Sequence, residues 1–155
     1  MKTKSTILII DDNKIDCLFH TTLIKRKFPN VEIEVEHHGK DGLDYIINLL
    51  KDGEHESLPI MIFADLYMPV MDGFEFLEQL KSVLEIFGHE NIPVFSISST
   101  ISEDDIEEAL SKDLCNGFVS KPIDSDKLGI LLRNVNGNSL ELSERVKSKQ
   151  KCILF

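Results

Sequence analysis

Hydrophobic residues gather in short runs that alternate with segments of helical periodicity. Residues 6–10 and 58–64 are apolar almost without interruption, as in strands that helices cover on both faces. Residues 92–97 and 117–121 predict two further short strands. The strict alternation over residues 31–36 predicts a strand with one wet face at a sheet edge.

Between these runs, apolar residues recur three and four positions apart, which is the spacing of one helix face. The five helical sets are Ile15, Leu18, Phe19 and Leu23; Leu43, Ile46, Ile47 and Leu50; Phe76, Leu77, Leu80, Leu84 and Phe87; Ile106, Ala109 and Leu110; and Leu128, Leu131 and Leu132. Parallel neighbouring strands need helical crossovers, and those crossovers are right-handed. The pattern therefore predicts a doubly wound α/β fold, a five-stranded parallel sheet with helices on both faces.

Polar residues stand where four of these strands end. They are Asp11 and Asp12, Asp65, Ser98 and Ser99, and Lys121. In such sheets ligands bind beyond the carboxyl ends of the strands, so we expect these side chains to meet at one edge. Three carboxylates placed together repel one another unless they are protonated or share a cation, and an all-oxygen set favours a hard ion such as Mg²⁺.

The same residues suit phosphoryl chemistry. Beside Mg²⁺, the ammonium group of Lys121 and the hydroxyl of Ser98 would complement the oxygens of a transferring phosphoryl group. A carboxylate with an ordinary pKa of about 3.9 is ionised at neutral pH and can attack phosphorus without a general base. Asp65 is the candidate nucleophile.

Composition narrows the choice of partners. The chain has 155 residues and a formal net charge of −10, so its field disfavours direct binding of nucleic acid or an anionic membrane surface. No run approaches the roughly 20 apolar residues of a membrane span, and the start lacks a secretory signal. The three cysteines, at unpatterned spacing, predict free thiols. We therefore expect a cytoplasmic protein.

With these motifs in place, the sequence resembles the response-regulator receiver domains of two-component signalling. The resemblance covers residues 7–134. It rests on Asp11-Asp12, the segment Asp65-Leu-Tyr-Met-Pro-Val-Met-Asp-Gly73, Ser98, and Lys121-Pro122. It implies the flavodoxin-like strand order 2-1-3-4-5, a receiver domain over residues 1–137, and a tail over 138–155 that is a short helix or disordered.

The resemblance also implies a role for each residue. Asp65 would accept a phosphoryl group from a phosphohistidine of a sensor histidine kinase or phosphotransfer protein. Asp12 would bind Mg²⁺ directly and Asp11 through water, with Asp65 and the backbone carbonyl of Tyr67 completing the protein ligands.

Backbone and switch roles follow in the same way. The amides of Leu66 and Ser99 would hold the phosphoryl group, and Ser98 would move toward it, which lets Phe118 turn inward. The output surface would be the fourth helix, fifth strand and fifth helix. The bulk of Tyr67, two residues after Asp65, leads to the hypothesis that it hinders the attacking water and lengthens the life of the phosphorylated state.

Each residue also has an ordinary structural explanation. Asp12 can be a helix cap, and Asp72 is better explained as one. Ser98 and Ser99 can be turn residues, Lys121 a solvated lysine, and Phe118 a core residue.

Taken together, the sequence predicts a stand-alone switch whose phosphorylation alters affinity for an unknown downstream protein. It would not be an enzyme beyond its own phosphotransfer and dephosphorylation. One alternative is an aspartyl-phosphate-forming phosphatase, although such enzymes usually present Asp-x-Asp and Asp65 is followed by Leu66 and Tyr67. A flavodoxin-like electron carrier is disfavoured by the two acids where a phosphate loop needs neutral donors. A phosphorylation-independent interaction module stays open.

Overall fold

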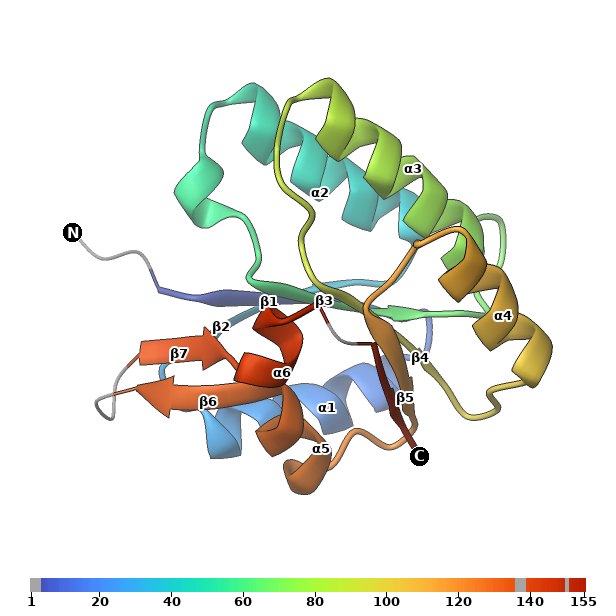
Figure 1. The fold of residues 1–155 in the computed structure, drawn as a ribbon. Helices are drawn as coiled ribbons and strands as arrows, with labels where there is room; N and C mark the ends of the chain where they lie inside the picture. Colours follow the sequence, from blue (N-terminus) through green and yellow to red (C-terminus); the bar gives the residue numbers. More distant parts are fainter. Residues whose placement is uncertain (1–3, 136–138, 150) are drawn as a thin grey trace.

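A six-stranded parallel sheet forms the centre of the molecule, which the computed structural model describes for residues 4–135, 139–149 and 151–155 (Figure 1). The strand order is β2-β1-β3-β4-β5-β8. These strands are β1 (Thr6–Ile10), β2 (Glu32–Glu36), β3 (Met61–Asp65), β4 (Val94–Ser98), β5 (Gly117–Ser120) and β8 (Cys152–Leu154). The predicted α/β class and the order 2-1-3-4-5 are confirmed, and a C-terminal strand is added beside β5.

Helices cover both faces of the sheet (Figure 1). One face packs against α2, α3 and α4, and the other against α1, α5 and α6. The helices are α1 (Lys14–Lys27), α2 (Gly39–Lys51), α3 (Gly73–Ile86), α4 (Glu103–Ser111), α5 (Ser125–Leu131), α6 (Glu144–Lys147) and the short 3₁₀ helix η1 (His55–Ser57). Within the described ranges, no helix combines the length and apolarity needed to cross a lipid bilayer.

The central strands are buried on both faces, as their uninterrupted apolar runs predict. Every residue of β3 and β4 is buried, whereas β2 lies at the edge and is partly exposed along its length. Burial of this kind is the main force that favours folding, at roughly 25 cal/mol for each Å² of apolar surface removed from water.

The first helix is found where the sequence predicts it, but three of its four predicted core residues face outward, and the fourth, Leu23, is partly buried against the core. The side chains of Ile15, Leu18 and Phe19 are 79%, 70% and 50% exposed. The helix instead buries Cys17, His20 and Ile24. Helix α1 therefore presents an apolar surface, here called the α1 patch (Ile15, Leu18 and Phe19), to solvent.

The C-terminal segment is built more regularly than the sequence predicts. Strand β6 (Leu132–Val135) pairs antiparallel with β7 (Ser139–Leu142), and helix α6 then leads to β8. The predicted boundary between residues 137 and 138 falls outside the described residues. A short helix is present, whereas β6, β7 and β8 were not predicted.

Strand β8 packs tightly against β5. The amide of Cys152 donates to the Asn116 carbonyl at 3.0 Å, and Lys151 Nζ donates to the Cys115 carbonyl at 2.7 Å. A Cβ on Gly117 would lie 1.7 Å from the Cys152 carbonyl oxygen. This approach requires glycine at position 117.

Candidate functional site

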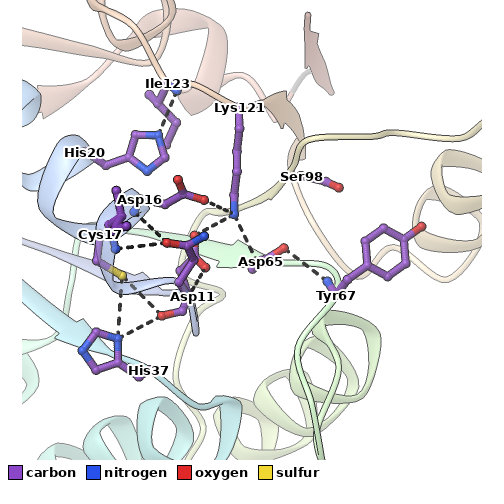
Figure 2. Close-up of polar contacts among 12 residues, drawn as sticks. Asp11, Asp16, Cys17, His20, His37, Asp65, Tyr67, Ser98, Lys121 and Ile123 are labelled. Carbon is purple, nitrogen blue, oxygen red and sulfur yellow. Dashed lines mark hydrogen bonds and ion pairs between the residues drawn. The ribbon is translucent and has the colours of Figure 1, made fainter.

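The carboxyl ends of β1, β3 and β5 bring three charged side chains together (Figure 2). The Lys121 ammonium nitrogen lies 2.8 Å from Asp11 Oδ2 and 3.2 Å from Asp65 Oδ2. It also lies 3.0 Å from Asp16 Oδ2, on the first turn of α1. Residues far apart in the sequence thus form one ionic cluster, as predicted for Asp11, Asp65 and Lys121.

Local packing fixes the position of Asp65. It is the last residue of β3, and the next amide, of Leu66, donates to the Ile97 carbonyl of β4 at 3.0 Å. The Gly73 amide donates to the Leu66 carbonyl at 2.8 Å, and a Cβ on Gly73 would lie 2.5 Å from the Asp65 carbonyl oxygen. Glycine at position 73 lets helix α3 start directly against the strand end.

One carboxylate oxygen from each of Asp11, Asp12 and Asp65 lies within 4.8 Å of the other two. Asp11 is fully buried, Asp65 is 6% exposed, and Asp12 is exposed. Asp11 Oδ1 accepts the Asn13 amide at 2.9 Å, whereas its buried Oδ2 makes the ion pair with Lys121 outside hydrogen-bond geometry. Clustered oxygens, one of them without a hydrogen bond, fit a hard cation such as Mg²⁺.

Burial and charge set the protonation of this cluster. Burial raises the pKa of Asp65 from 3.8 to about 6; Asp11 adds to the rise, while Lys121 and the Tyr67 amide oppose it. Burial by itself would lower the pKa of Lys121, but its close contacts with the carboxylates of Asp11 and Asp16 outweigh burial and raise that pKa. Lys121 is therefore a permanent cation here, and a divalent ion would favour the ionised form of Asp65.

The loop that carries Lys121 is anchored from three sides. The Lys121 amide donates to the Ser98 carbonyl at 2.8 Å. Lys127 of α5 donates from Nζ to the carbonyls of Ser120 and Pro122, at 2.8 and 3.0 Å. His20 of α1 accepts the Ile123 amide at 3.1 Å (Figure 2). These contacts explain how a residue just after a strand end is held in place.

Ser98 ends β4, Ser99 follows it, and Phe118 lies on β5. In the described part of the chain, none of the three makes a hydrogen bond to the Asp65 side chain. The Ser98 hydroxyl donates to the Thr100 carbonyl at 2.6 Å and is directed away from Asp65 (Figure 2). Ser99 is exposed. Phe118 is fully buried and lies opposite Ile153 of β8. Phe118 already points inward with Ser98 turned away, so the switch roles stay predictions.

The backbone around Asp65 corrects one prediction. The Leu66 amide cannot hold a phosphoryl group as predicted, because the β3–β4 ladder uses it. The Tyr67 amide instead donates to Asp65 Oδ1 at 3.2 Å. The amide that faces the carboxylate is therefore that of Tyr67, which a simple count along the loop missed.

The side chain of Tyr67 leaves the cluster. It is directed away from Asp65 (Figure 2), and its hydroxyl donates to the carboxylate of Asp105 on α4. This hydrogen bond, with burial, raises the pKa of Tyr67 to about 12. The phenol therefore stays protonated and can bridge the β3–α3 loop to α4.

Sequence reasoning also missed three neighbours on α1. Asp16 contacts Lys121, Cys17 Sγ donates to the Asp11 carbonyl at 3.3 Å, and His20 binds the loop after Lys121. Burial, with Asp11, raises the pKa of Cys17 to about 11, so its thiol is a structural donor. The acidic residue in the first turn of α1 was the available signal, but acids there usually complement the helix dipole.

Comparison with known proteins identifies the family of this chain. The model of the family described as response regulator receiver domain matches residues 7–133. The chain belongs to the response regulator receiver domain family. A probable methanogenesis regulatory protein, FilR2, of Methanothrix harundinacea is 34% identical over 126 residues, covering 79% of this chain and 75% of that protein. The osmosensing histidine protein kinase SLN1 of Saccharomyces cerevisiae is 31% identical, covering 84% of this chain but only 10% of the kinase.

Solved structures agree. The receiver domain of the histidine kinase CKI1 from Arabidopsis thaliana, complexed with Mg²⁺, is 26% identical with a TM-score of 0.70, covering 81% of this chain and 89% of that one. A two-component response regulator from Cytophaga hutchinsonii is 26% identical with a TM-score of 0.67, covering 82% and 93%. A receiver domain of the same fold thus binds Mg²⁺, and this chain has an acidic cluster that could do so.

Proposed function

We propose that this receiver domain is a phosphorylation-controlled switch that accepts a phosphoryl group on Asp65. The observation that carries the proposal is the ion pair of Asp65 with Lys121 beside Asp11 and Asp12, at one sheet edge. Bound Mg²⁺ would supply positive charge against the phosphoryl oxygens. Asp12, Asp11, Asp65 and the Tyr67 carbonyl would hold it.

The chemistry is a transfer between two protein side chains. A carboxylate oxygen of Asp65 attacks the phosphorus of a phosphohistidine; the new O–P bond forms as the N–P bond breaks, and the imidazole nitrogen keeps the electron pair. Lys121 neutralises charge on the phosphoryl oxygens, and the amides of Tyr67 and Ser99 provide donors to them. The attack requires the ionised form of Asp65. Burial disfavours this form, and the nearby cations favour it.

A donor protein would dock beside Asp65 on the α1 patch. Contiguous exposed apolar side chains on a small domain mark interaction surfaces, and α1 starts at the sheet edge that carries the ionic cluster. The relatives, which include a histidine protein kinase, favour a sensor kinase or a phosphotransfer protein as donor. Free, buried cysteines fit a cytoplasmic setting for this exchange.

Downstream, phosphorylation would alter affinity for another protein. The added group carries about −1.5 to −2 charges, and coupling between such a site and a binding surface is typically about 1–3 kcal/mol. The surface formed by α4, β5 and α5 includes β8 in this chain, because β8 covers the β5 edge. A partner of the switched state would therefore contact the C-terminal segment as well.

Intact-mass measurement tests the phosphoacceptor. Wild type, Asp65→Asn and Asp72→Asn are incubated with Mg²⁺ and a small-molecule phosphodonor. We expect one added phosphoryl group on wild type and none on Asp65→Asn. Asp72→Asn should also gain one, because asparagine can cap helix α3 as Asp72 does. Modification of Asp65→Asn to the same extent as wild type would reject Asp65 as acceptor, and turnover of a small phosphate ester would favour the phosphatase alternative.

A second experiment tests the docking surface. A double variant, Ile15→Ser with Leu18→Ser, is compared with wild type for phosphorylation by a phosphorylated histidine phosphotransfer protein and by the small molecule. We expect loss of transfer from the protein donor with unchanged transfer from the small molecule. Equal transfer from the protein donor to both would place the docking surface elsewhere.

A further inference from the structure

Lys121 has a third carboxylate partner that the proposed phosphotransfer does not use. Asp16 Oδ2 lies 3.0 Å from Lys121 Nζ, in a hydrogen bond between residues 105 positions apart. The Lys121 side chain is 11% exposed and that of Asp16 is 34% exposed. The pair is thus shielded from water on one side, where an ion pair is stronger than at an open surface.

The three partners of Lys121 are not equivalent. Oxygens of Asp11 and Asp65 belong to the group that lies within 4.8 Å together with Asp12, and the oxygens of Asp16 do not. Asp11 and Asp65 therefore have two possible partners, the ammonium group and a divalent cation. Of these two possible partners, Asp16 contacts the ammonium group of Lys121.

A divalent cation among the acids would compete with Lys121 for Asp11 and Asp65. Two positive charges that share the same oxygens repel one another, and a poorly solvated ammonium group without a counter-ion is costly. With Asp16 in place, the ammonium group keeps one anionic partner as its contacts with the other two loosen.

We propose that Asp16 is a positioning residue that acts through Lys121, holding the ammonium group at the site while Asp11 and Asp65 engage Mg²⁺. The proposal rests on the proposed function in that it takes Mg²⁺ as the resident cation. Asp16 thereby lowers the electrostatic cost of Mg²⁺ binding and keeps Lys121 within reach of the phosphoryl oxygens.

A simpler explanation makes a different prediction. Asp16 could act only as one more negative charge near the cation, or as a first-turn acid that complements the dipole of α1. Both effects would be independent of Lys121. A double-mutant cycle therefore separates the explanations, because it isolates the part of one residue's effect that needs the other.

The test is a calorimetric titration of the full chain with MgCl₂, without phosphodonor. Four proteins form the cycle: wild type, Asp16→Asn, Lys121→Met and the double variant. We expect Asp16→Asn to weaken Mg²⁺ binding about fivefold in the wild-type background and by less than about twofold in the Lys121→Met background. The same loss in both backgrounds would overturn the proposal.

Controls exclude a structural effect. Asp41→Asn removes the first-turn acid of α2 and should leave the Mg²⁺ affinity unchanged. Asp16→Glu keeps the carboxylate and should recover most of the lost affinity. If Asp16→Asn unfolds, Asp16→Ser replaces it in the cycle, with thermal unfolding as the check.

The experiment distinguishes failure of the role proposed for Asp16 from failure of the proposed function. Wild type that binds Mg²⁺ and is phosphorylated on Asp65, with an additive cycle, would overturn the role of Asp16 alone. Wild type that binds no Mg²⁺ would overturn both.

Discussion

His20 and Ile123 are joined by a hydrogen bond in which the histidine Nε2 accepts the Ile123 amide at 3.1 Å. Nε2 must be unprotonated to accept, so the ring is neutral and its proton is on Nδ1. Burial lowers the pKa of His20 from 6.5; Asp16 and Asp11 oppose the shift, while Lys121 and Lys127 add to it. A charged His20 would release the loop that holds Lys121.

This contact predicts a loss of stability in mild acid. The pKa of His20 is lower in the folded chain than in the unfolded one, so its stabilising contribution is complete above about pH 6.5 and is lost as pH falls below that value. Below pH 6.5, the unfolding free energy of wild type should fall as the pH falls. We expect that fall to be less steep in His20→Gln, by up to about 1.4 kcal/mol per pH unit. Urea unfolding at several pH values measures it. The exposed His38, as His38→Gln, is the control, and an unchanged slope in His20→Gln would contradict the prediction.

The close approach of Gly117 to Cys152 predicts that Gly117→Ala releases β8. The methyl group would occupy the space of the Cys152 carbonyl, 1.7 Å away. Cys152, fully buried in wild type, should then react with an alkylating reagent, whereas Cys17 stays protected. Peptide mass spectrometry after native labelling gives both rates. Gly129→Ala, where the nearest atom would be 3.6 Å away, should behave as wild type. Full protection of Cys152 in Gly117→Ala would show that β8 tolerates the methyl group.

A strained residue lies in the loop after Asp65. Val70 has a φ of 70°, is fully exposed, and is the centre of a tight turn in which the Met71 amide donates to the Pro69 carbonyl at 2.9 Å. A β-branched residue is unfavourable there. We expect Val70→Gly to stabilise the chain by about 1 kcal/mol, and Val70→Ala by less, in denaturant unfolding. A loss of stability in Val70→Gly would be the contrary result.

Tyr67 gives a kinetic prediction. The ring is bonded to α4 in this structure, so it hinders the attacking water only if it turns back toward Asp65. In that case, Tyr67→Asn should shorten the life of the phosphorylated state roughly tenfold, which corresponds to about 1.4 kcal/mol of barrier. Tyr67→Phe keeps the ring but loses the hydrogen bond to Asp105, so its decay should be no faster than that of wild type. The readout is intact mass against time after removal of the phosphodonor. Equal decay of wild type and Tyr67→Asn would refute the hypothesis.

Much of the fold could be predicted because the central strands are apolar on both faces and end in polar residues. The convergence of Asp11, Asp65 and Lys121 followed from strand direction alone. The roles of single groups could not be derived from strand direction, as the Leu66 amide illustrates. Whether an amide can donate to a bound phosphoryl group depends on the hydrogen bonds between β3 and β4, and no residue pattern specifies these bonds.

Periodicity identified helix α1 but not its buried face. Ile15, Leu18 and Phe19 have the spacing of a core stripe, yet the core side carries Cys17 and His20. An apolar stripe for a partner and one for the core have the same period, so spacing cannot separate them. Strand β8 was missed for another reason: its three residues are too few to show any period.

Strand β8 also changes what the molecule offers to other chains. A sheet that stopped at β5 would leave a row of unpaired amides and carbonyls, the usual template for edge-to-edge aggregation. Here the edge strand on that side is β8, which is only three residues long, and the edge strand on the opposite side, β2, has glutamates at positions 32, 34 and 36. Detachment of the C-terminal segment should therefore reduce solubility before it reduces stability.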